Sequence, residues 1–442
     1  MPKSVHEIRD PIHVFVRLDN HEREVLNSRP FQRLRHIHQL ALTYLVYPGA
    51  THKRFEHSLG VMELAGRVFD IITDNATDEI RARLEPLNNQ DERRYWRRVL
   101  RMAALCHDVG HLPFSHAAEK QLLPNGWDHE KLTRAIIASD DMKAIWERIT
   151  PPLRHEDIVK VALGPKKAND LLFSDWETIL SEIIVGDAFG VDRMDYLLRD
   201  SHHVGVAYGR FDHYRLVDTL RILQIAPSGE GDDSKEAALG VEEGGIQSAE
   251  ALMLARYFMY SQVYFHQIRR IYDTHLMEFL SEWLQGGNFP TDINQHLRIT
   301  DNEVTAALLE AAFDNGKAGH LHARRIVLRE HFKVLYERNP DDVKINPEAG
   351  KSVFEALSTE FGREHFRHDR YHQSTGAPDF PVRMRDGQIV SSLAVSDTLN
   401  RVPIVSVDYV FAERSIVSKA SAWLRKHRAD IVKPREEEGD NG

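Results

Sequence analysis

The sequence predicts a mainly α-helical protein with a small β-hairpin and a C-terminal α+β lobe. Apolar side chains recur at three- and four-residue spacings through much of the first 285 residues, a pattern typical of amphipathic helices. Two short apolar runs, 221–226 and 237–242, flank a polar, glycine-containing segment and predict a hairpin with an acidic tip. Three runs near the C-terminus predict strands, over residues 381–385, 388–395 and 402–412.

The helices are expected over residues 20–46, 57–74, 92–107, 175–200 and 248–284, with a closing helix over 415–427. The first has apolar residues at mixed spacings and stops before Pro48 and Gly49. The second has a wide apolar stripe. The third begins charged and becomes apolar, so its C-terminal half should enter the core.

Residues 286–300 contain glycine and proline and predict a boundary between a helical catalytic body and a C-terminal α+β lobe. We expect a catalytic core over residues 1–285, an α+β lobe packed on it over 286–432, and a disordered acidic tail over 433–442. Basic and apolar residues alternate in the segment 324–333. We expect a solvated helix face there rather than a nucleic-acid contact.

Composition limits the classes of function. With 442 residues, of which 42% are hydrophobic, the chain can bury a large core or two or three smaller ones. A net charge of −10 does not favour passive binding of nucleic acid. The single cysteine, Cys106, excludes an intramolecular disulfide and is expected to be a small buried side chain. The sequence has no apolar signal core and no membrane-spanning run, so we expect a soluble cytoplasmic protein without a membrane partner.

Four candidate metal ligands lie in three separated motifs. They are His57 in RFEHSLG, His107 and Asp108 in LCHDVGHLPFSH, and Asp192 in GVDRMDYLLRD. Two imidazoles and two carboxylates are ligands that borderline and hard divalent cations accept. Such a cation polarises a phosphate oxygen and lowers the pKa of a bound water, which phosphoester hydrolysis requires. The sequence therefore predicts a metal-dependent phosphohydrolase.

The alternative for His107 and Asp108 is a buried histidine hydrogen-bonded to its neighbour. A second His-Asp pair, His368 and Asp369, has no apolar helix before it and is expected to lie in a solvated loop. The first pair differs because it follows an apolar helix and precedes Gly110 and further histidines. This context favours the metal interpretation.

These three motifs resemble those of the HD-domain phosphohydrolases. More narrowly, they resemble the deoxynucleoside-triphosphate triphosphohydrolases, the family of the sterile-alpha-motif HD-domain enzyme and its bacterial relatives. The resemblance covers roughly residues 8–430, and no sterile-alpha-motif domain is expected before it. It implies a helical HD-domain core, one divalent cation on the four ligands, and water attack at the α-phosphorus of a dNTP. The products would be a deoxynucleoside and inorganic triphosphate.

The resemblance also implies a choice of cation. Manganese, magnesium and iron suit these ligands, zinc and nickel suit them less well, and an additional magnesium can accompany the nucleotide.

The resemblance places catalytic roles on further histidines and carboxylates. His111, His116 and His129 match positions that line the α-phosphate and the leaving 5′ oxygen. A protonated imidazole assists a poor alkoxide leaving group, and we expect His116 to be that general acid. Glu119 supports His116, at a position where the best-known relative has aspartate, and Glu130 supports His129. The alternative for each histidine is a core or N-cap residue.

Eight residues match substrate contacts of this family. Arg54, Arg193 and Arg256 match polyphosphate contacts, since a guanidinium binds two phosphate oxygens at once. The alternative, most relevant for Arg193, is a surface salt bridge. The remaining residues match contacts around the sugar, where a tyrosine ring against C2′ leaves no room for a 2′-hydroxyl; they are Gln39, Tyr196, Asp200, Tyr260 and Tyr264.

Regulation and assembly are also implied by the resemblance. Gln32 and Arg35 match the base-reading residues of an activator site for guanine nucleotides between subunits, and Asn27 replaces the acidic partner in that site. We therefore expect a homo-oligomer, either dimer or tetramer, with a guanine-nucleotide activator. The alternative is that Gln32 and Arg35 are packing and capping residues of the first helix.

Two other functions remain open. One is an HD-family nuclease or a hydrolase of a modified or cyclic nucleotide, which would share the metal ligands. The other is a catalytically weak nucleotide sensor, against which the full set of ligands and auxiliary histidines argues.

Overall fold

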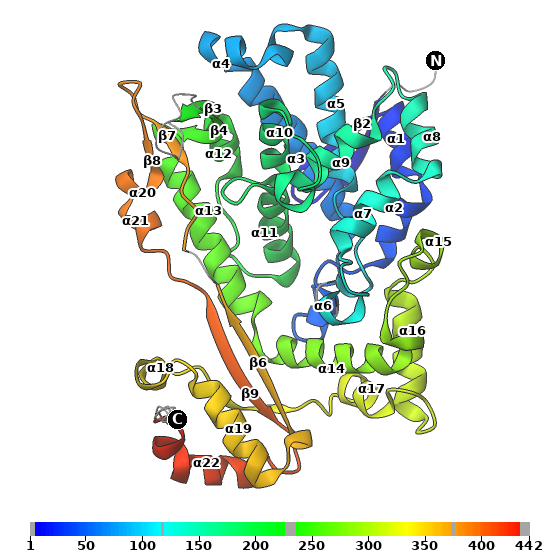
Figure 1. Ribbon diagram of the computed structural model, residues 1–442, viewed down its shortest axis with the longest axis vertical. Helices are drawn as coiled ribbons and strands as arrows, with labels where there is room; N and C mark the ends of the chain where they lie inside the picture. Colours follow the sequence, from blue (N-terminus) through cyan, green and yellow to red (C-terminus); the bar gives the residue numbers. More distant parts are fainter. Residues whose placement is uncertain (1–4, 116–118, 226–235, 374–375, 434–442) are drawn as a thin grey trace, which may run out of the picture. The chain divides into compact units, whose positions relative to one another are not determined.

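The computed structural model describes residues 5–115, 119–225, 236–373 and 376–433 (Figure 1). The chain forms two compact units, each assembled from separate segments. The first unit comprises residues 1–259, 288–305 and 375–403, and the second comprises 260–287, 306–374 and 404–442.

The first unit begins with an antiparallel hairpin of β1 (Val5–Asp10) and β2 (Val14–Asp19), which the sequence had not predicted. The single helix predicted over 20–46 is wrong. The segment forms α1 (Asn20–Leu26), α2 (Arg29–Arg33) and two 3-10 helices, Leu34–His36 and Ala41–Leu45. Pro30 in the first turn of α2 starts a new helix there, because proline suits that position and no interior one.

Helices α3 (Arg54–Asp74) and α5 (Gln90–Cys106) form the centre of the first unit, packed directly against each other. They confirm the helices predicted over 57–74 and 92–107. The helix predicted over 175–200 is two helices, α10 (Asp175–Val185) and α11 (Val191–Val204), because Gly186 ends the first and Gly190 begins the second. Figure 1 shows α3, α10 and α11 side by side, and all three are in mutual contact.

Further helices surround this centre. They are α4 (Asp78–Arg83), α6 (Glu119–Leu122), α7 (His129–Ile137), α8 (Asp140–Arg148), α9 (His155–Lys167), α12 (His213–Thr219), α13 (Ile246–Met259), α15 (Ile293–His296), α20 (Ser392–Val395) and α21 (Asp397–Asn400). None of the helices in the described ranges is both long and apolar enough to cross a membrane.

A four-stranded sheet in the order β3-β4-β7-β8 completes the first unit. Its strands are β3 (Leu220–Ile225), β4 (Glu236–Glu242), β7 (Pro381–Arg383) and β8 (Ile389–Ser391). The predicted hairpin is confirmed by the antiparallel register from Leu220–Val241 to Ile225–Glu236, and its predicted acidic tip lies outside the described residues. The strand predicted over 388–395 is shorter, because α20 begins at Ser392.

The second unit contains a three-stranded sheet in the order β5-β9-β6. The strands are β5 (Lys333–Glu337), β6 (Phe366–His372) and β9 (Ser406–Ala412), with α19 (Ala349–Phe361) and α22 (Val417–Ile431) packed on one another and α19 on β6. Other helices of this unit are α14 (Gln267–Trp283), α17 (His320–Val327) and α18 (Pro340–Ile345), and α16 (Asp301–Phe313) runs from the first unit into the second.

Three local predictions in this region are wrong. His368 and Asp369 lie in β6, where His368 Nε2 is 2.8 Å from Asp408 Oδ1, so this pair is not a solvated loop. The helix predicted over 248–284 is interrupted by a π-helical turn at Tyr260–Tyr264. The segment 324–333 leaves the helix after Val327 and buries Phe332, so it is not one solvated helix face.

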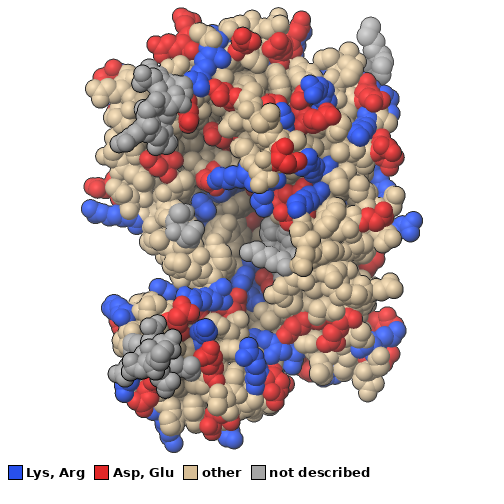
Figure 2. Space-filling view, viewed as in Figure 1, with Lys and Arg blue, Asp and Glu red and all other residues tan. Residues whose placement is uncertain are grey.

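Charged side chains of both signs are interspersed over the visible surface of each unit (Figure 2). Within each unit, the described residues on this face therefore form no continuous basic stripe of the kind that follows a nucleic-acid backbone.

Candidate metal centre

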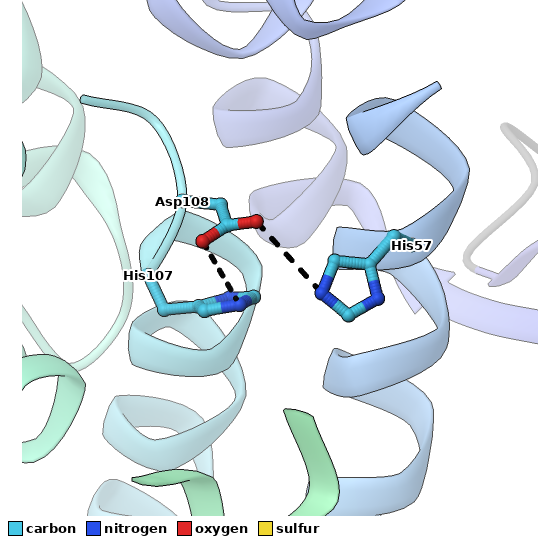
Figure 3. Close-up of side chains that lie close together, drawn as sticks. All are labelled: His57, His107 and Asp108. Atoms are coloured by element: carbon cyan, nitrogen blue, oxygen red, sulfur yellow. Dashed lines mark ion pairs between the residues drawn. The ribbon is translucent and has the colours of Figure 1, made fainter. Parts of the chain in front are cut away.

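The four predicted metal ligands come together in the first unit. His57 lies in the first turn of α3, His107 is the C-cap of α5, Asp108 follows it, and Asp192 lies in the first turn of α11. α5 ends at Cys106, and the side chains of the next two residues, His107 and Asp108, both lie at the same place. Figure 3 shows Asp108 between the two imidazoles, within ion-pairing distance of both.

The ligand atoms of His57, His107 and Asp108 all lie within 4.8 Å of one another. Asp192 completes the group, because its Oδ1 lies 3.0 Å from His57 Nε2 and 3.5 Å from His107 Nε2. The first three side chains are buried, whereas Asp192 is 35% exposed. The cluster is thus open to solvent on the side of α11.

Both histidines are held in the tautomer that a metal requires. His57 Nδ1 lies 2.8 Å from Asp195 Oδ2, and His107 Nδ1 lies 2.8 Å from the carbonyl oxygen of Ala104. Each Nδ1 therefore donates its proton to an oxygen, so Nε2 is the nitrogen that faces the cluster and that can bind an ion once it has lost its proton. His107 Nε2 is buried and forms no hydrogen bond within the described structure. A buried nitrogen of this kind is costly unless another partner, such as a cation, is bound.

The charges around the cluster also favour a cation. Burial lowers the pKa of His57, but hydrogen bonds to Asp192 and Asp195 outweigh it and raise the pKa from 6.5 to about 10. Without a bound cation, His57 would therefore be protonated at neutral pH. Two guanidiniums, Arg54 and Arg199, face four carboxylates, which leaves two negative charges; the carboxylates are Asp10, Asp108, Asp192 and Asp195. The donor set and the charge both fit one divalent ion.

A second group of metal-type side chains in the second unit does not fit a cation. His275, Glu278 and His322 have ligand atoms within 4.8 Å of one another. However, His275 Nε2 accepts a hydrogen bond from the backbone N–H of Phe332, so the proton lies on the nitrogen that faces Glu278. Arg367 also donates to Glu278. The carboxylate is already paired with a guanidinium, so the group is an ion-pair network.

The predicted catalytic residues are only partly described. His111 Nε2 lies 3.1 Å from Asp108 Oδ1, and its ring stacks on that of His129 with centroids 4.1 Å apart. His129 begins α7 and lies 3.3 Å from Glu130, which pairs with Lys167. Burial and the neighbouring Arg54 and His129 keep the pKa of His111 well below its usual value. His116 lies outside the described residues, and Glu119 begins α6 without a described side chain.

Of the predicted phosphate contacts, Arg54 lies at the cluster. Its Nη1 donates to Asp108 and its Nε donates to Ser115 Oγ over 2.9 Å. Arg193 binds the backbone carbonyls of Gly186 and Asp187 and so braces the turn before α11. The hydrogen bond from Lys166 lowers the pKa of Asp187 most, and Arg256, which lies nearby on α13, lowers it further.

The predicted sugar contacts are divided between the units. Gln39 is buried, and its side-chain oxygen has no hydrogen-bond partner in the described part of the chain. Asp200 accepts from His52 over 2.7 Å, both residues being buried, and Tyr196 is half-buried on α11. Tyr260 and Tyr264 belong to the π-helical turn of the second unit, where their rings lie edge to face.

The residues matched to the activator site make contacts within their own chain. Gln32 donates to the carbonyl oxygen of Leu26 over 2.7 Å and accepts from Arg35 over 2.9 Å. Arg35 also lies over the ring of Phe55 at 3.5 Å. Asn27 is the exposed C-cap of α1. These are the packing and capping contacts of the alternative interpretation.

Sequence reasoning missed two buried carboxylates, one that binds a ligand of the cluster and one that holds the turn next to Arg54. Asp195 binds His57, and its spacing of three residues from Asp192 on one helix was the signal that would have revealed it. Asp301 accepts from the backbone N–H of Phe114 over 2.8 Å and from His38 over 2.6 Å. Phe114 and Ser115 have positive φ angles, 54° and 58°, which side-chain-bearing residues rarely adopt. Asp301 therefore secures a strained turn that holds Ser115 against Arg54.

Comparison with known families gives two matches in this chain. Residues 54–163 match the HD domain, and residues 211–362 match the HD-associated region. The first match includes His57, His107 and Asp108. Asp192 and Asp195 lie between the two matched segments.

Several relatives are similar over much of the chain. An uncharacterized protein of Methanocaldococcus jannaschii is 36% identical over 64% of this chain and 50% of its own length. The uncharacterized protein YwfO of Bacillus subtilis is 33% identical over 62% of this chain and 54% of its own. The deoxynucleoside triphosphate triphosphohydrolase SAMHD1 of Homo sapiens is 28% identical over 78% of this chain and 57% of its own. The chain thus spans about half the length of the curated relatives it matches.

A solved structure matches nearly the whole chain. It is a crystal structure of a hypothetical protein from Aquifex aeolicus, with a TM-score of 0.77 and 32% sequence identity. The match covers 95% of this chain and 100% of the other.

Proposed function

The chain belongs to the HD-domain phosphohydrolase family, and we propose that it hydrolyses deoxynucleoside triphosphates to deoxynucleosides and inorganic triphosphate. The observation that carries the proposal is the cluster of His57, His107, Asp108 and Asp192, with both Nε2 atoms facing one point. The motifs around these ligands are similar to those of the triphosphohydrolases, and relatives of that printed name are 28% identical to this chain.

A bound divalent cation supplies two effects in such a site, since it polarises an α-phosphate oxygen and lowers the pKa of a coordinated water. We expect manganese, magnesium or iron. The four ligands would hold the ion, and the exposed side of Asp192 would leave room for substrate. Arg54 is fixed beside Asp108 by Ser115, so its guanidinium is ready to bind a phosphate oxygen close to the ligands.

Proton transfer falls to the histidines beside the cluster. The departing 5′ oxygen needs a proton, and His116, supported by Glu119, is the proposed donor. His111 and His129 are stacked next to Asp108 and are proposed to contact the α-phosphate. Arg193 and Arg256 are the further polyphosphate contacts in this proposal.

Selection of deoxyribose is assigned to the remaining matched residues. Tyr264 is proposed to press on C2′, with Gln39, Tyr196, Asp200 and Tyr260 around the sugar. His52 holds the carboxylate of Asp200 through a buried hydrogen bond, so this acceptor is fixed before substrate arrives.

The test is direct. Purified protein is incubated with Mn²⁺ or Mg²⁺ and each dNTP in turn, and the products are separated by chromatography. Deoxynucleoside and triphosphate are the expected products, and the Asp192→Ala variant should form neither. Deoxynucleoside monophosphate as product, or cleavage of single-stranded DNA with inert dNTPs, would instead identify another HD-family hydrolase.

We also propose a homo-oligomer activated by a guanine nucleotide at Asn27, Gln32 and Arg35. The support is the match of these residues to the family's activator site. Binding there would require Gln32 and Arg35 to exchange their present contacts for the base. Turnover of dNTP measured with and without GTP or dGTP tests this, because equal rates would reject activation.

A further inference from the structure

We propose that Asp195 is a positioning residue of the metal centre, locked by Arg199 and by the N-terminal hairpin through His13 and Asp10. The inference rests on the proposed metal centre and assigns a role to four residues that lie outside both matched family segments.

Asp195 is saturated by side-chain donors. Its Oδ2 lies 2.8 Å from His57 Nδ1 and accepts from Arg199 Nε over 2.8 Å. Its Oδ1 lies 2.7 Å from His13 Nε2 and accepts from Arg199 Nη2 over 2.9 Å. Neither Asp195 nor Arg199 has any exposed surface. The carboxylate therefore has one fixed orientation, and it transmits that orientation to the ring of His57.

The N-terminal hairpin fixes the other end of this network. Arg199 Nη1 donates to Asp10 Oδ2 over 2.9 Å. Asp10 Oδ1 accepts from the backbone N–H groups of Ile12 and His13, both over 2.8 Å. The turn between β1 and β2 is thereby shaped by the same aspartate that binds Arg199. Residues 10–13 are thus connected to the metal ligand His57 by an unbroken chain of hydrogen bonds.

The chemistry of this arrangement explains why the network matters to a metal. A carboxylate that accepts the Nδ1 proton keeps the lone pair on Nε2 and makes that nitrogen a better ligand. The plane of the His57 ring is fixed as well, so little conformational entropy is lost when the ion binds. Arg199 and His13 saturate Asp195, which keeps this carboxylate from turning toward the ion as a competing ligand.

A purely structural ion pair is the alternative, and the molecule contains a matched control for it. Arg101 donates to Glu22 over 2.6 Å, and both side chains are under 10% exposed. This pair also joins the N-terminal hairpin region to a central helix, since Arg101 binds the carbonyl oxygen of Arg17. It touches none of the four ligands. Loss of Glu22 should therefore affect stability without affecting the metal.

The experiment compares Asp195→Asn with Glu22→Gln in the full-length protein. Mn²⁺ affinity is measured by electron paramagnetic resonance, and the melting temperature is measured without metal. We expect Asp195→Asn to weaken Mn²⁺ binding about 10- to 100-fold, and Glu22→Gln to leave the affinity within about twofold while lowering the melting temperature. Unchanged affinity in Asp195→Asn, with a wild type that binds Mn²⁺, would overturn this inference alone.

A second variant covers the case in which Asp195→Asn does not fold. His13→Ala removes one of the four donors to Asp195 and leaves the Arg199 pair in place. Weaker Mn²⁺ binding at a wild-type melting temperature would support the positioning role, and unchanged binding would refute it. A wild-type protein that binds no divalent ion would overturn both this inference and the proposed function.

Discussion

Replacing Gly60 with alanine should destabilise the first unit and disturb the metal centre. Gly60 lies on α3, three residues after His57, and faces Asp195 and Arg199 of α11. An added Cβ would lie 1.9 Å from Asp195 Oδ1 and 2.4 Å from Arg199 Nη2. Both partners are fully buried and bound to each other, so neither can move aside without breaking the pair.

The size of the effect follows from opposing contributions. Alanine in a helix interior is favoured over glycine by about 1 kcal/mol. Overpacking of a core costs about 1–3 kcal/mol, and breaking a buried ion pair costs about 3–5 kcal/mol. Because the clash requires movement of more than an ångström, we expect the unfavourable contributions to dominate. The broken pair alone, less the alanine gain, should lower the free energy of unfolding by about 2–4 kcal/mol, and overpacking adds to this loss.

Urea denaturation followed by circular dichroism measures this difference. Gly376→Ala is the matched control, since a Cβ there meets nothing within 4 Å, and its effect should stay within about 0.5 kcal/mol. Gly60→Ala should also bind Mn²⁺ more weakly, because the displaced Asp195 no longer holds His57. A Gly60→Ala variant as stable as the wild type, or more stable by the propensity gain, would refute the close approach of α3 and α11.

Three further predictions concern pH, thiol chemistry and substrate choice. Burial lowers the pKa of His331 from 6.5 to about 4, so the folded state binds fewer protons than the unfolded chain between these values. The free energy of unfolding should therefore fall, by up to about 1.4 kcal/mol per unit, as the pH drops from 6.5 to 4; urea titrations should show a smaller fall in His331→Phe. Burial raises the pKa of Cys106 to about 12, so iodoacetamide at pH 8 should label the folded protein at least roughly 100-fold more slowly than the urea-unfolded chain; equal rates would contradict the burial. The Tyr264→Ala variant should hydrolyse ribonucleoside triphosphates in the turnover assay. If it still does not, another residue must select deoxyribose over ribose.

The sequence predicted the helices whose apolar stripe runs without interruption. α3 and α5 were found because their periodicity, length and ends agree. The break at Gly186–Gly190 was missed because apolar residues continue on both sides of it. The π-helical turn at Tyr260–Tyr264 contains neither glycine nor proline, so periodicity alone cannot locate it. Such interruptions depend on contacts with other parts of the chain.

Strands with mixed polarity were also missed. β6 reads FRHDRYH, in which only Phe366 is fully buried, so no apolar alternation marks it. The strand exists because it pairs with β9 along seven residues, and Asp369 is ion-paired with Arg270 across the unit. Pairing between distant segments decides the structure here, and no local pattern reports it.

In the candidate site too, residues within motifs were predicted and contacts between distant segments were not. His57, His107, Asp108 and Asp192 were predicted from their motifs, and they lie together. Asp195 and Asp301 were not predicted. The spacing of Asp195 from Asp192 on one helix could have revealed it, whereas Asp301 carries no local signature of its partners. Asp301 meets His38 and Phe114 from far along the chain. Arg54 was predicted to bind phosphate, and in the structure it pairs with the ligand Asp108.

Metal stoichiometry of the wild type and of the single-ligand variants tests the central claim most directly. Each protein is dialysed against Mn²⁺, freed of excess ion, and analysed by inductively coupled plasma mass spectrometry. The wild type should hold one divalent ion per chain, and His57→Ala, His107→Ala, Asp108→Ala and Asp192→Ala should each hold almost none while remaining folded by circular dichroism. A metal-free wild type, or four variants that retain a full ion, would contradict the account.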